Sequence, residues 1–268
     1  MEFDPRETPE HNAPKPFYIL RPHVIVPLIL YFIFFRKVSN YVKRNFWLSF
    51  NGFKQYRLQN LSICWLHAVI VGIADLIVVF THWTEMFDDV IHYWSPIVAQ
   101  VPLISVSYFI HDALDMLSYE WSTYTVELLF HHVMTCIALA TPSMTDRFLL
   151  ATGWALLMEV NSIFLHARTI LQLCGISKEF PNIFKWIIYI NIGTFVIFRQ
   201  FSQIFWCIWA AANLRDVHFF YQIIGFICPI IFGYINGLLF MRLLASDGFL
   251  SESLRIRFQT TRDKERND

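Results

Sequence analysis

Histidine and carboxylate side chains recur at helical spacing inside apolar segments of this sequence. His111 and Asp115 are four residues apart, as are Glu127 and His131, and His132 follows directly. Residues four apart lie on one face of a helix. A histidine beside a carboxylate can act as a general base in acyl transfer to an amine or a hydroxyl group. The candidate catalytic residues are therefore the paired histidines His131 and His132, with Glu127 to orient them.

Further polar residues of the same segments are candidates for binding a membrane phospholipid or acyl-CoA: His111, Asp112, Asp115, Glu159, Ser162, His166, Arg199 and Gln203. A charge near the bilayer centre costs about 2.5–3.5 kcal/mol even on a lenient insertion scale, so each needs a polar partner. We expect the polar faces to surround one lipid-accessible pocket, in which Arg199 neutralises Glu159 or Glu127. The alternative is a set of structural hydrogen bonds between helices, worth about 0.6 kcal/mol each.

Several other chemistries lack their residue patterns. The sequence has a single His-His pair and no HxxH, whereas di-iron lipid desaturases need many clustered histidines. It has no GxSxG nucleophile elbow, and its five scattered cysteines give no CxxC or zinc-ligand spacing. We expect no metal and no cofactor, although acyl-CoA could serve as a substrate. A net charge of zero removes the electrostatic basis for nucleic-acid binding.

The composition indicates an all-α, polytopic membrane bundle. Of the 268 residues, 56% are hydrophobic and 16% are charged, against about 25% charged residues in soluble domains. A membrane-spanning helix needs roughly 20 apolar residues. About seven segments qualify: Phe17–Phe35, Leu61–Phe80, Ile97–Met116, Thr125–Pro142, Phe148–Leu171, Phe184–Ala211 and Phe219–Leu244. The alternative is six spans and one re-entrant segment.

Lysine and arginine positions predict how the chain is oriented. The loop after the first segment is basic, with Lys54 and Arg57 near its end, whereas the loop after the second contains Glu85, Asp88 and Asp89. Basic loops stay on the cytoplasmic side. We therefore expect a polar extracellular N-terminus over residues 1–16, a transmembrane bundle over 17–247 and a charged cytoplasmic tail over 248–268. The expected location is the plasma membrane, with the endoplasmic reticulum as the alternative.

Two further features concern helix packing. Asp75 in the second segment is expected to pair with His67 or with a neighbouring helix. Gly233 and Gly237 form a GxxxG motif in the last segment. Small residues at this spacing allow close helix contact in membranes. The motif indicates tight packing within the protein or a homodimer.

The order of the polar motifs resembles the TLC domain family of helical membrane proteins, which includes the ceramide synthases. The resemblance rests on four pieces, namely Tyr108–Asp112, Phe130–Thr135, Leu156–Leu165 with Arg168, and Phe198–Arg199. Weaker similarity extends it from about residue 57 to residue 247. Within the family, the sequence is most similar to the subfamily of TLC domain-containing proteins 1 and 2.

This resemblance implies a role in lipid metabolism. Ceramide synthases have, one helix after the paired histidines, a His-Asp pair needed for acyl transfer, and Met158-Glu159 occupy that place here. The subfamily implies limited incorporation of polyunsaturated acyl chains into phospholipids. We therefore expect a regulator of plasma-membrane phospholipid acyl composition and fluidity. The alternatives are an acyl-CoA-dependent acyltransferase that uses the paired histidines, and a regulator of a channel or receptor.

Overall fold

Backbone polar groups find no water inside a bilayer, so a segment that crosses it must satisfy them internally. The apolar segments of this chain do so as α-helices. The computed structural model describes residues 9–119 and 123–258, except the side chains of Pro9, Thr123, Tyr124 and Glu127. These described ranges contain helices and turns but no strand.

The long helices account for most of the described chain. They are α1 (Pro22–Asn45), α2 (Gly52–Thr81), α4 (Gln100–Leu117), α5 (Thr123–Thr145), α6 (Leu149–Leu156), α7 (Met158–Leu173), α9 (Pro181–Phe195), α10 (Ser202–Asn213) and α11 (Phe219–Ser246). A π-helical turn, η4 (Val196–Phe201), joins α9 to α10. Short helical turns lie between them: η2 (Pro9–His11), η3 (Pro16–Leu20), α3 (Glu85–Asp88) and α8 (Ile176–Glu179).

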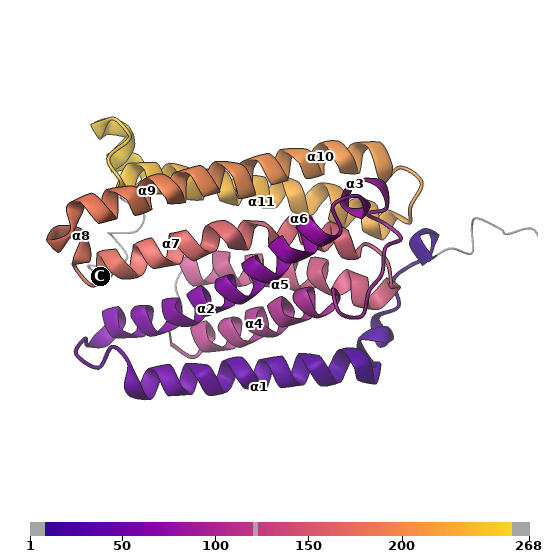
Figure 1. The fold of residues 1–268 in the computed structure, drawn as a ribbon, viewed down its shortest axis with the longest axis horizontal. Coiled ribbons are helices and arrows are strands. Elements are labelled where there is room, and N and C mark those ends of the chain that lie inside the picture. Colours follow the sequence, from indigo (N-terminus) through magenta and orange to yellow (C-terminus); the bar gives the residue numbers. More distant parts are fainter. Residues whose placement is uncertain (1–8, 120–122, 259–268) are drawn as a thin grey trace, which may run out of the picture.

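The helices run roughly along one direction and form a bundle (Figure 1). Within residues 9–119 and 123–258, six helices are long and apolar enough to cross a membrane, with α6–α7 and α9–α10 each counted as one. α4 is a further helix of 18 residues that packs against α1, α2 and α5. Its apolar run is interrupted by His111, Asp112 and Asp115, and it is not one of these six helices. The predicted all-helical membrane bundle is confirmed.

The first two helices differ from the predicted spans at their ends. α1 begins at Pro22 rather than at Phe17, because residues 16–20 form the 3-10 turn η3. Proline is favoured at the first position of a helix, where its missing N–H would have no partner. α1 then continues to Asn45, and α2 begins at Gly52, nine residues before the predicted Leu61. Hydropathy marks the apolar core of a helix, and these helices continue beyond that core.

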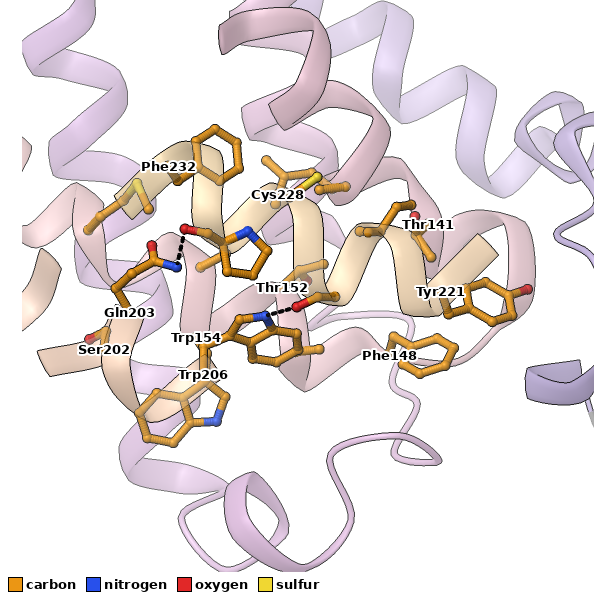
Figure 2. A pocket seen from close by; sticks show the side chains of 18 of the residues that line it. Thr141, Phe148, Thr152, Trp154, Ser202, Gln203, Trp206, Tyr221, Cys228 and Phe232 are labelled. Carbon is orange, nitrogen blue, oxygen red and sulfur yellow. Dashed lines mark hydrogen bonds between the residues drawn. The ribbon is translucent and has the colours of Figure 1, made fainter. Parts of the chain in front are cut away.

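Helices α10 and α11 are joined by two hydrogen bonds around Pro229. Proline has no N–H, so the Gly225 carbonyl one turn earlier loses its helical donor. The Trp206 indole N–H donates to that carbonyl at 3.3 Å, and the Gln203 amide donates to the Pro229 carbonyl at 3.0 Å, as drawn in Figure 2. A Cβ at Gly225 would collide with Leu214 Cδ1, so a larger residue there would require the Leu214 side chain to move. These contacts fix one wall of the pocket described below.

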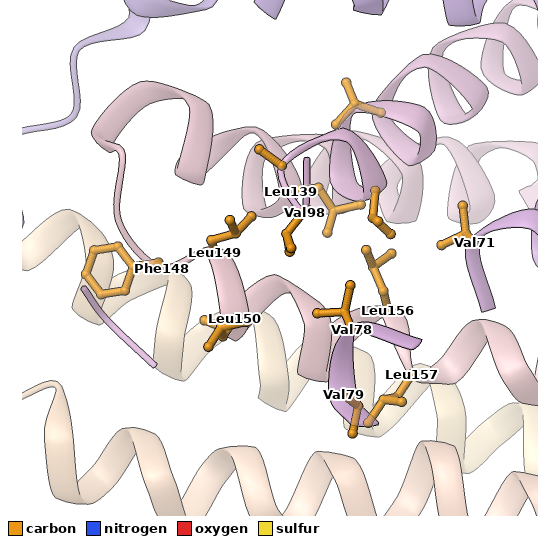
Figure 3. Close-up of a cluster of buried hydrophobic side chains, with 14 of the residues drawn as sticks. Val71, Val78, Val79, Val98, Leu139, Phe148, Leu149, Leu150, Leu156 and Leu157 are labelled. Carbon is orange, nitrogen blue, oxygen red and sulfur yellow. The ribbon is translucent and has the colours of Figure 1, made fainter. Parts of the chain in front are cut away.

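Helices α2 and α7 make the most extensive helix contact of the described bundle. A Cβ at Gly72 would lie 3.1 Å from the backbone of Glu159 and Val160, so glycine lets the two backbones approach closely. Buried apolar side chains continue this contact toward α5 and α6 (Figure 3), with Val71, Val78, Leu139 and Leu156 among them. This packing brings α7 polar residues next to α2.

The described part of the N-terminal segment lies against the loops at one end of the bundle. Glu10 is 5% exposed, and its carboxylate pairs with His92 and Arg147, each at 3.3 Å. Arg21 makes a bidentate ion pair with Asp146, with both bonds at 2.9 Å. The segment is therefore attached to the loops before α4 and between α5 and α6.

Candidate functional site

Arg199 occupies the π-helical turn between α9 and α10, in the interior of the bundle. π-helical turns inside α-helices are frequent at functional sites. The guanidinium is 9% exposed and donates three hydrogen bonds: to Asn161 Oδ1 at 2.8 Å, to Ser162 Oγ at 2.8 Å and to Asn236 Oδ1 at 2.9 Å. These partners come from α7 and α11, so Arg199 connects three membrane helices.

Neighbouring side chains orient this network. The Asn161 amide donates to Asn191 Oδ1 at 3.0 Å and to Thr194 Oγ1 at 3.1 Å, which leaves its carbonyl oxygen directed at Arg199. The predicted direct neutralisation by Glu159 is not observed, because Arg199 forms no ion pair among the described side chains; Glu159 acts on it only through space. The asparagines of this network, Asn161, Asn191 and Asn236, were not predicted as site residues, although amides inside apolar segments indicate buried polar contacts.

A pocket runs beside this network between α5, α6, α10 and α11 (Figure 2). The empty space between its walls, counted together with its opening to the outside, is about 830 Å³. Mostly apolar and aromatic side chains line it, from Phe148 and Tyr221 at one end to Phe232 near Arg199. Of the predicted site residues, Arg199 and Gln203 line this pocket.

Glu159 belongs to a second cluster, on the side of α7 that faces α2. His67 Nδ1 lies 3.8 Å from Glu159 Oε2, and its other ring nitrogen is 3.2 Å from Ser105 Oγ. The His67 ring stacks on Tyr108 with centroids 3.9 Å apart. Asp75 does not pair with His67 in the described structure: it lies against Gly153 of α6, and its Oδ2 has no hydrogen-bond partner.

The paired histidines lie between α4 and α5 and are directed to different neighbours. His132 Nε2 is 3.5 Å from Asp112 Oδ2, and Asn60 donates to the other Asp112 oxygen at 2.7 Å. His131 meets the edge of Phe232, with centroids 5.1 Å apart. Because Phe232 also lines the pocket, one aromatic ring separates His131 from that space.

Other predicted site residues lie farther from the pocket. Asp115 pairs with Lys43 of α1 rather than with His111, whose ring packs edge-on against Phe32. His166 is half-buried and interacts electrostatically with His67. The Glu127 side chain lies outside the described residues.

The predicted polar faces therefore do not surround one lipid-accessible pocket. The described residues form a largely apolar pocket and separate buried polar clusters. The physical reason is size, since phenylalanine rings such as Phe109 and Phe232 fill the space between the polar faces. In the described ranges, no three histidine, cysteine or carboxylate side chains converge as a metal site would require.

Together, these features define a multi-pass helical membrane protein with a buried arginine network beside a largely apolar pocket. The TLC domain model matches residues 57–245, which is most of the chain. The chain belongs to the TLC domain family, a family linked to lipid metabolism and membrane regulation.

Relatives are found among the TLC domain-containing proteins 1 and 2. The chain is 30% identical to TLC domain-containing protein 2 of Danio rerio over 212 residues, which cover 79% of this chain and 85% of the relative. It is 31% identical to TLC domain-containing protein 1 of Gallus gallus over 56% of this chain and 58% of the relative. It is 25% identical to the Homo sapiens TLC domain-containing protein 2, over 70% of each chain. No solved structure matches the chain.

Proposed function

We propose that this protein regulates the acyl composition of plasma-membrane phospholipids and thereby membrane fluidity, by binding lipid acyl chains in the pocket beside Arg199. It would limit the incorporation of polyunsaturated chains. The observation that carries the proposal is a largely apolar pocket with a buried arginine in its wall. Membership of the TLC domain family, which is linked to lipid metabolism and membrane regulation, supports the proposal.

The pocket has the chemistry that an acyl lipid requires. Apolar walls remove a hydrocarbon chain from water, which contributes about 0.8 kcal/mol per buried CH₂ group. Arg199 uses three N–H donors within the protein, and a guanidinium has five. The remaining donors are suited to a carboxylate or ester oxygen. Gln203 adds a polar side chain to the same wall.

The test of this proposal is lipid analysis of cells. Cells that lack the protein should contain more polyunsaturated phospholipid, and the native chain should restore the profile. Arg199→Gln should restore it poorly, because the pocket loses its cation. Lys185→Gln, which removes an exposed cation from the same long helix, is the matched control and should restore it fully. An unchanged profile in cells lacking the protein under saturated-fat stress would reject the proposal.

A second candidate function is acyl-CoA-dependent acyltransfer by the paired histidines. The observation in its favour is the buried His132–Asp112 pair at 3.5 Å, because a carboxylate can orient a histidine that acts as a general base. Purified protein with acyl-CoA and candidate acceptors should then turn over, and His131→Ala should abolish turnover. Full function of a folded His131/His132 double variant would exclude this chemistry.

The proposed orientation places the C-terminal tail, residues 248–268, in the cytoplasm and residues 1–16 outside. It is supported by the position of charges at the two ends of the bundle. Lys43 of α1 and Lys54 of α2 lie at one end, whereas Glu85 and Asp88 of α3 lie at the other (Figure 1). Basic residues favour the cytoplasmic side. Accessibility labelling of single cysteines at both termini tests the orientation.

We also propose that two copies associate through Gly233 and Gly237 of α11. A Cβ at Gly237 would meet no atom within 4 Å, which leaves room for a partner helix there, whereas a Cβ at Gly233 would lie 3.9 Å from Gln203 Cγ of the same chain. Small residues at this spacing support close helix contact. Gly237→Leu should lower the dimer fraction measured by cross-linking in membranes, and an unchanged fraction would contradict the proposal.

A further inference from the structure

The Glu159 carboxylate is directed toward α2 and does not line the pocket. Ala155 and Met158 line the pocket, whereas the Glu159 carboxylate meets His67 of α2 at 3.8 Å. The side chain is nearly buried, with 9% of the residue exposed. This carboxylate therefore lies next to residues that line the space in which we propose that acyl chains bind.

Arg199 belongs to both environments. It lines the pocket, and its guanidinium donates to Ser162, which lies one turn along α7 from Glu159 on the same face. The opposite charges of Arg199 and Glu159 attract each other through the protein interior. Such interactions are much stronger in a low-dielectric interior than in water. Arg199 thus compensates the charge of Glu159 while it faces the pocket.

A second buried carboxyl group lies close by. Asp75 is 1% exposed, its Oδ2 has no hydrogen-bond partner, and its charge interacts with that of Glu159. The titratable and charged groups that act on Glu159 come from α2, α4 and η4; they are Cys64, His67, Asp75, Tyr108 and Arg199. In this set Arg199 is the permanently charged cation. An additional anion at Arg199 would therefore leave buried negative charge without compensation.

We propose that Glu159 takes up a proton from water when a long-chain fatty acid carboxylate binds to Arg199 in the pocket. One O–H bond of a hydronium ion breaks and one O–H bond forms on the Glu159 carboxylate, which becomes a neutral carboxyl group, with a water molecule left behind. Proton uptake and anion binding then favour each other by linkage. This inference rests on the proposed lipid-binding function of the pocket and specifies its ligand class and its regulation by pH.

Two probes test the inference on the full chain in lipid nanodiscs. Hexadecyl sulfonate remains anionic throughout the experiment, so any pH dependence of its affinity reports a group on the protein. Methyl palmitate has a similar chain without a charge. Between about pH 5 and pH 8, the affinity for the sulfonate should rise as the pH falls, by up to roughly tenfold per pH unit for one linked proton. The affinity for methyl palmitate should stay constant.

Substitutions identify the group that takes up the proton. Glu159→Gln removes the ionisable group, so it should bind the sulfonate with an affinity that is high and independent of pH. Glu85→Gln, which removes an exposed carboxylate of α3, is the matched control and should keep the pH dependence of the native chain. Binding of methyl palmitate to Glu159→Gln shows that its pocket is intact.

The possible results separate this inference from the proposed function. If neither probe binds the native chain, the proposed lipid site and the coupling are both wrong. If both probes bind and the sulfonate affinity does not change with pH, the lipid site stands and the coupling is overturned. A pH dependence that persists in Glu159→Gln also overturns the assignment. The native chain alone decides the first two results, even if the variant fails to fold.

Discussion

Two buried arginines of this bundle are bound in different ways. Arg168, near the end of α7, is 5% exposed and forms an ion pair with Asp247, with further hydrogen bonds to Ser246 and Gln172. Arg199, in the middle of the long α9–α10 helix, donates to neutral amide and hydroxyl oxygens. The first has its own carboxylate partner, whereas the second has none among the described side chains and faces a pocket. Arg168 therefore connects two helix ends, and Arg199 is the arginine that we propose binds an anionic ligand.

The largest expected effect follows from removal of the Arg168 charge. Arg168→Gln would leave Asp247, whose side chain is 2% exposed, buried without its cation. Breaking a buried ion pair in this way costs about 3–5 kcal/mol. We expect a clear loss of thermal stability in detergent, with lipid binding by the folded fraction unchanged. The double variant Arg168→Gln/Asp247→Asn should be more stable than the single one, and equal stabilities would contradict the role assigned to this pair.

The second prediction concerns ligand binding by Arg199. Arg199→Gln removes the charged donor, and a hydrogen bond to a charged group contributes about 1.5–3 kcal/mol. Affinity for an anionic long-chain probe should fall by roughly ten- to hundredfold, while affinity for a neutral ester should change less. Equilibrium binding in nanodiscs measures both. Equal losses for the charged and neutral probes would mean that Arg199 only maintains the shape of the pocket.

The third prediction concerns a variant in which Arg199 has a carboxylate partner, as Arg168 has. Asn236→Asp keeps the size of the side chain and places a carboxylate where Arg199 now donates at 2.9 Å. Anionic probes should then bind more weakly, by about 1 kcal/mol or roughly fivefold, since the new carboxylate competes for the guanidinium. The thermal unfolding temperature should not fall. Unchanged affinity for the anionic probe would show that binding does not depend on whether Arg199 has a carboxylate partner within the protein.

The difference between the two arginines also shows what the sequence could predict. Spacing and hydropathy predicted an all-helical membrane bundle, and the helices lie close to the predicted segments, because 3.6-residue periodicity and span length are local properties. Arg199 and Gln203, four residues apart on one helix, both line the pocket. His111 and Asp115 are also four residues apart, but Asp115 has its partner Lys43 on another helix.

Partner choice between helices depends on rotations and aromatic packing that no local pattern encodes. The predicted lipid-accessible pocket required the polar faces of all these helices to turn toward one axis. Instead, the close contact at Gly72 draws Glu159 toward α2, while Phe109 and Phe232 separate the histidines from the pocket. Asn161 and Asn236 were not predicted as site residues, because the cost of burying charge points to ionisable residues and not to neutral amides. An interior guanidinium needs acceptors, and amides provide them without adding charge.

The smallest expected effect comes from a third arginine, Arg21. Like Arg168 it has a carboxylate partner, but it is less buried. Arg21 makes a bidentate pair with Asp146, and these side chains are 26% and 36% exposed. Water and salt screen such pairs, which contribute about 0.2–1 kcal/mol. Arg21→Gln should therefore lower stability slightly, and added salt should reduce the difference from the native chain. A loss as large as that of Arg168→Gln would mean that attachment of the N-terminal segment, rather than burial, determines how strongly an ion pair stabilises this bundle.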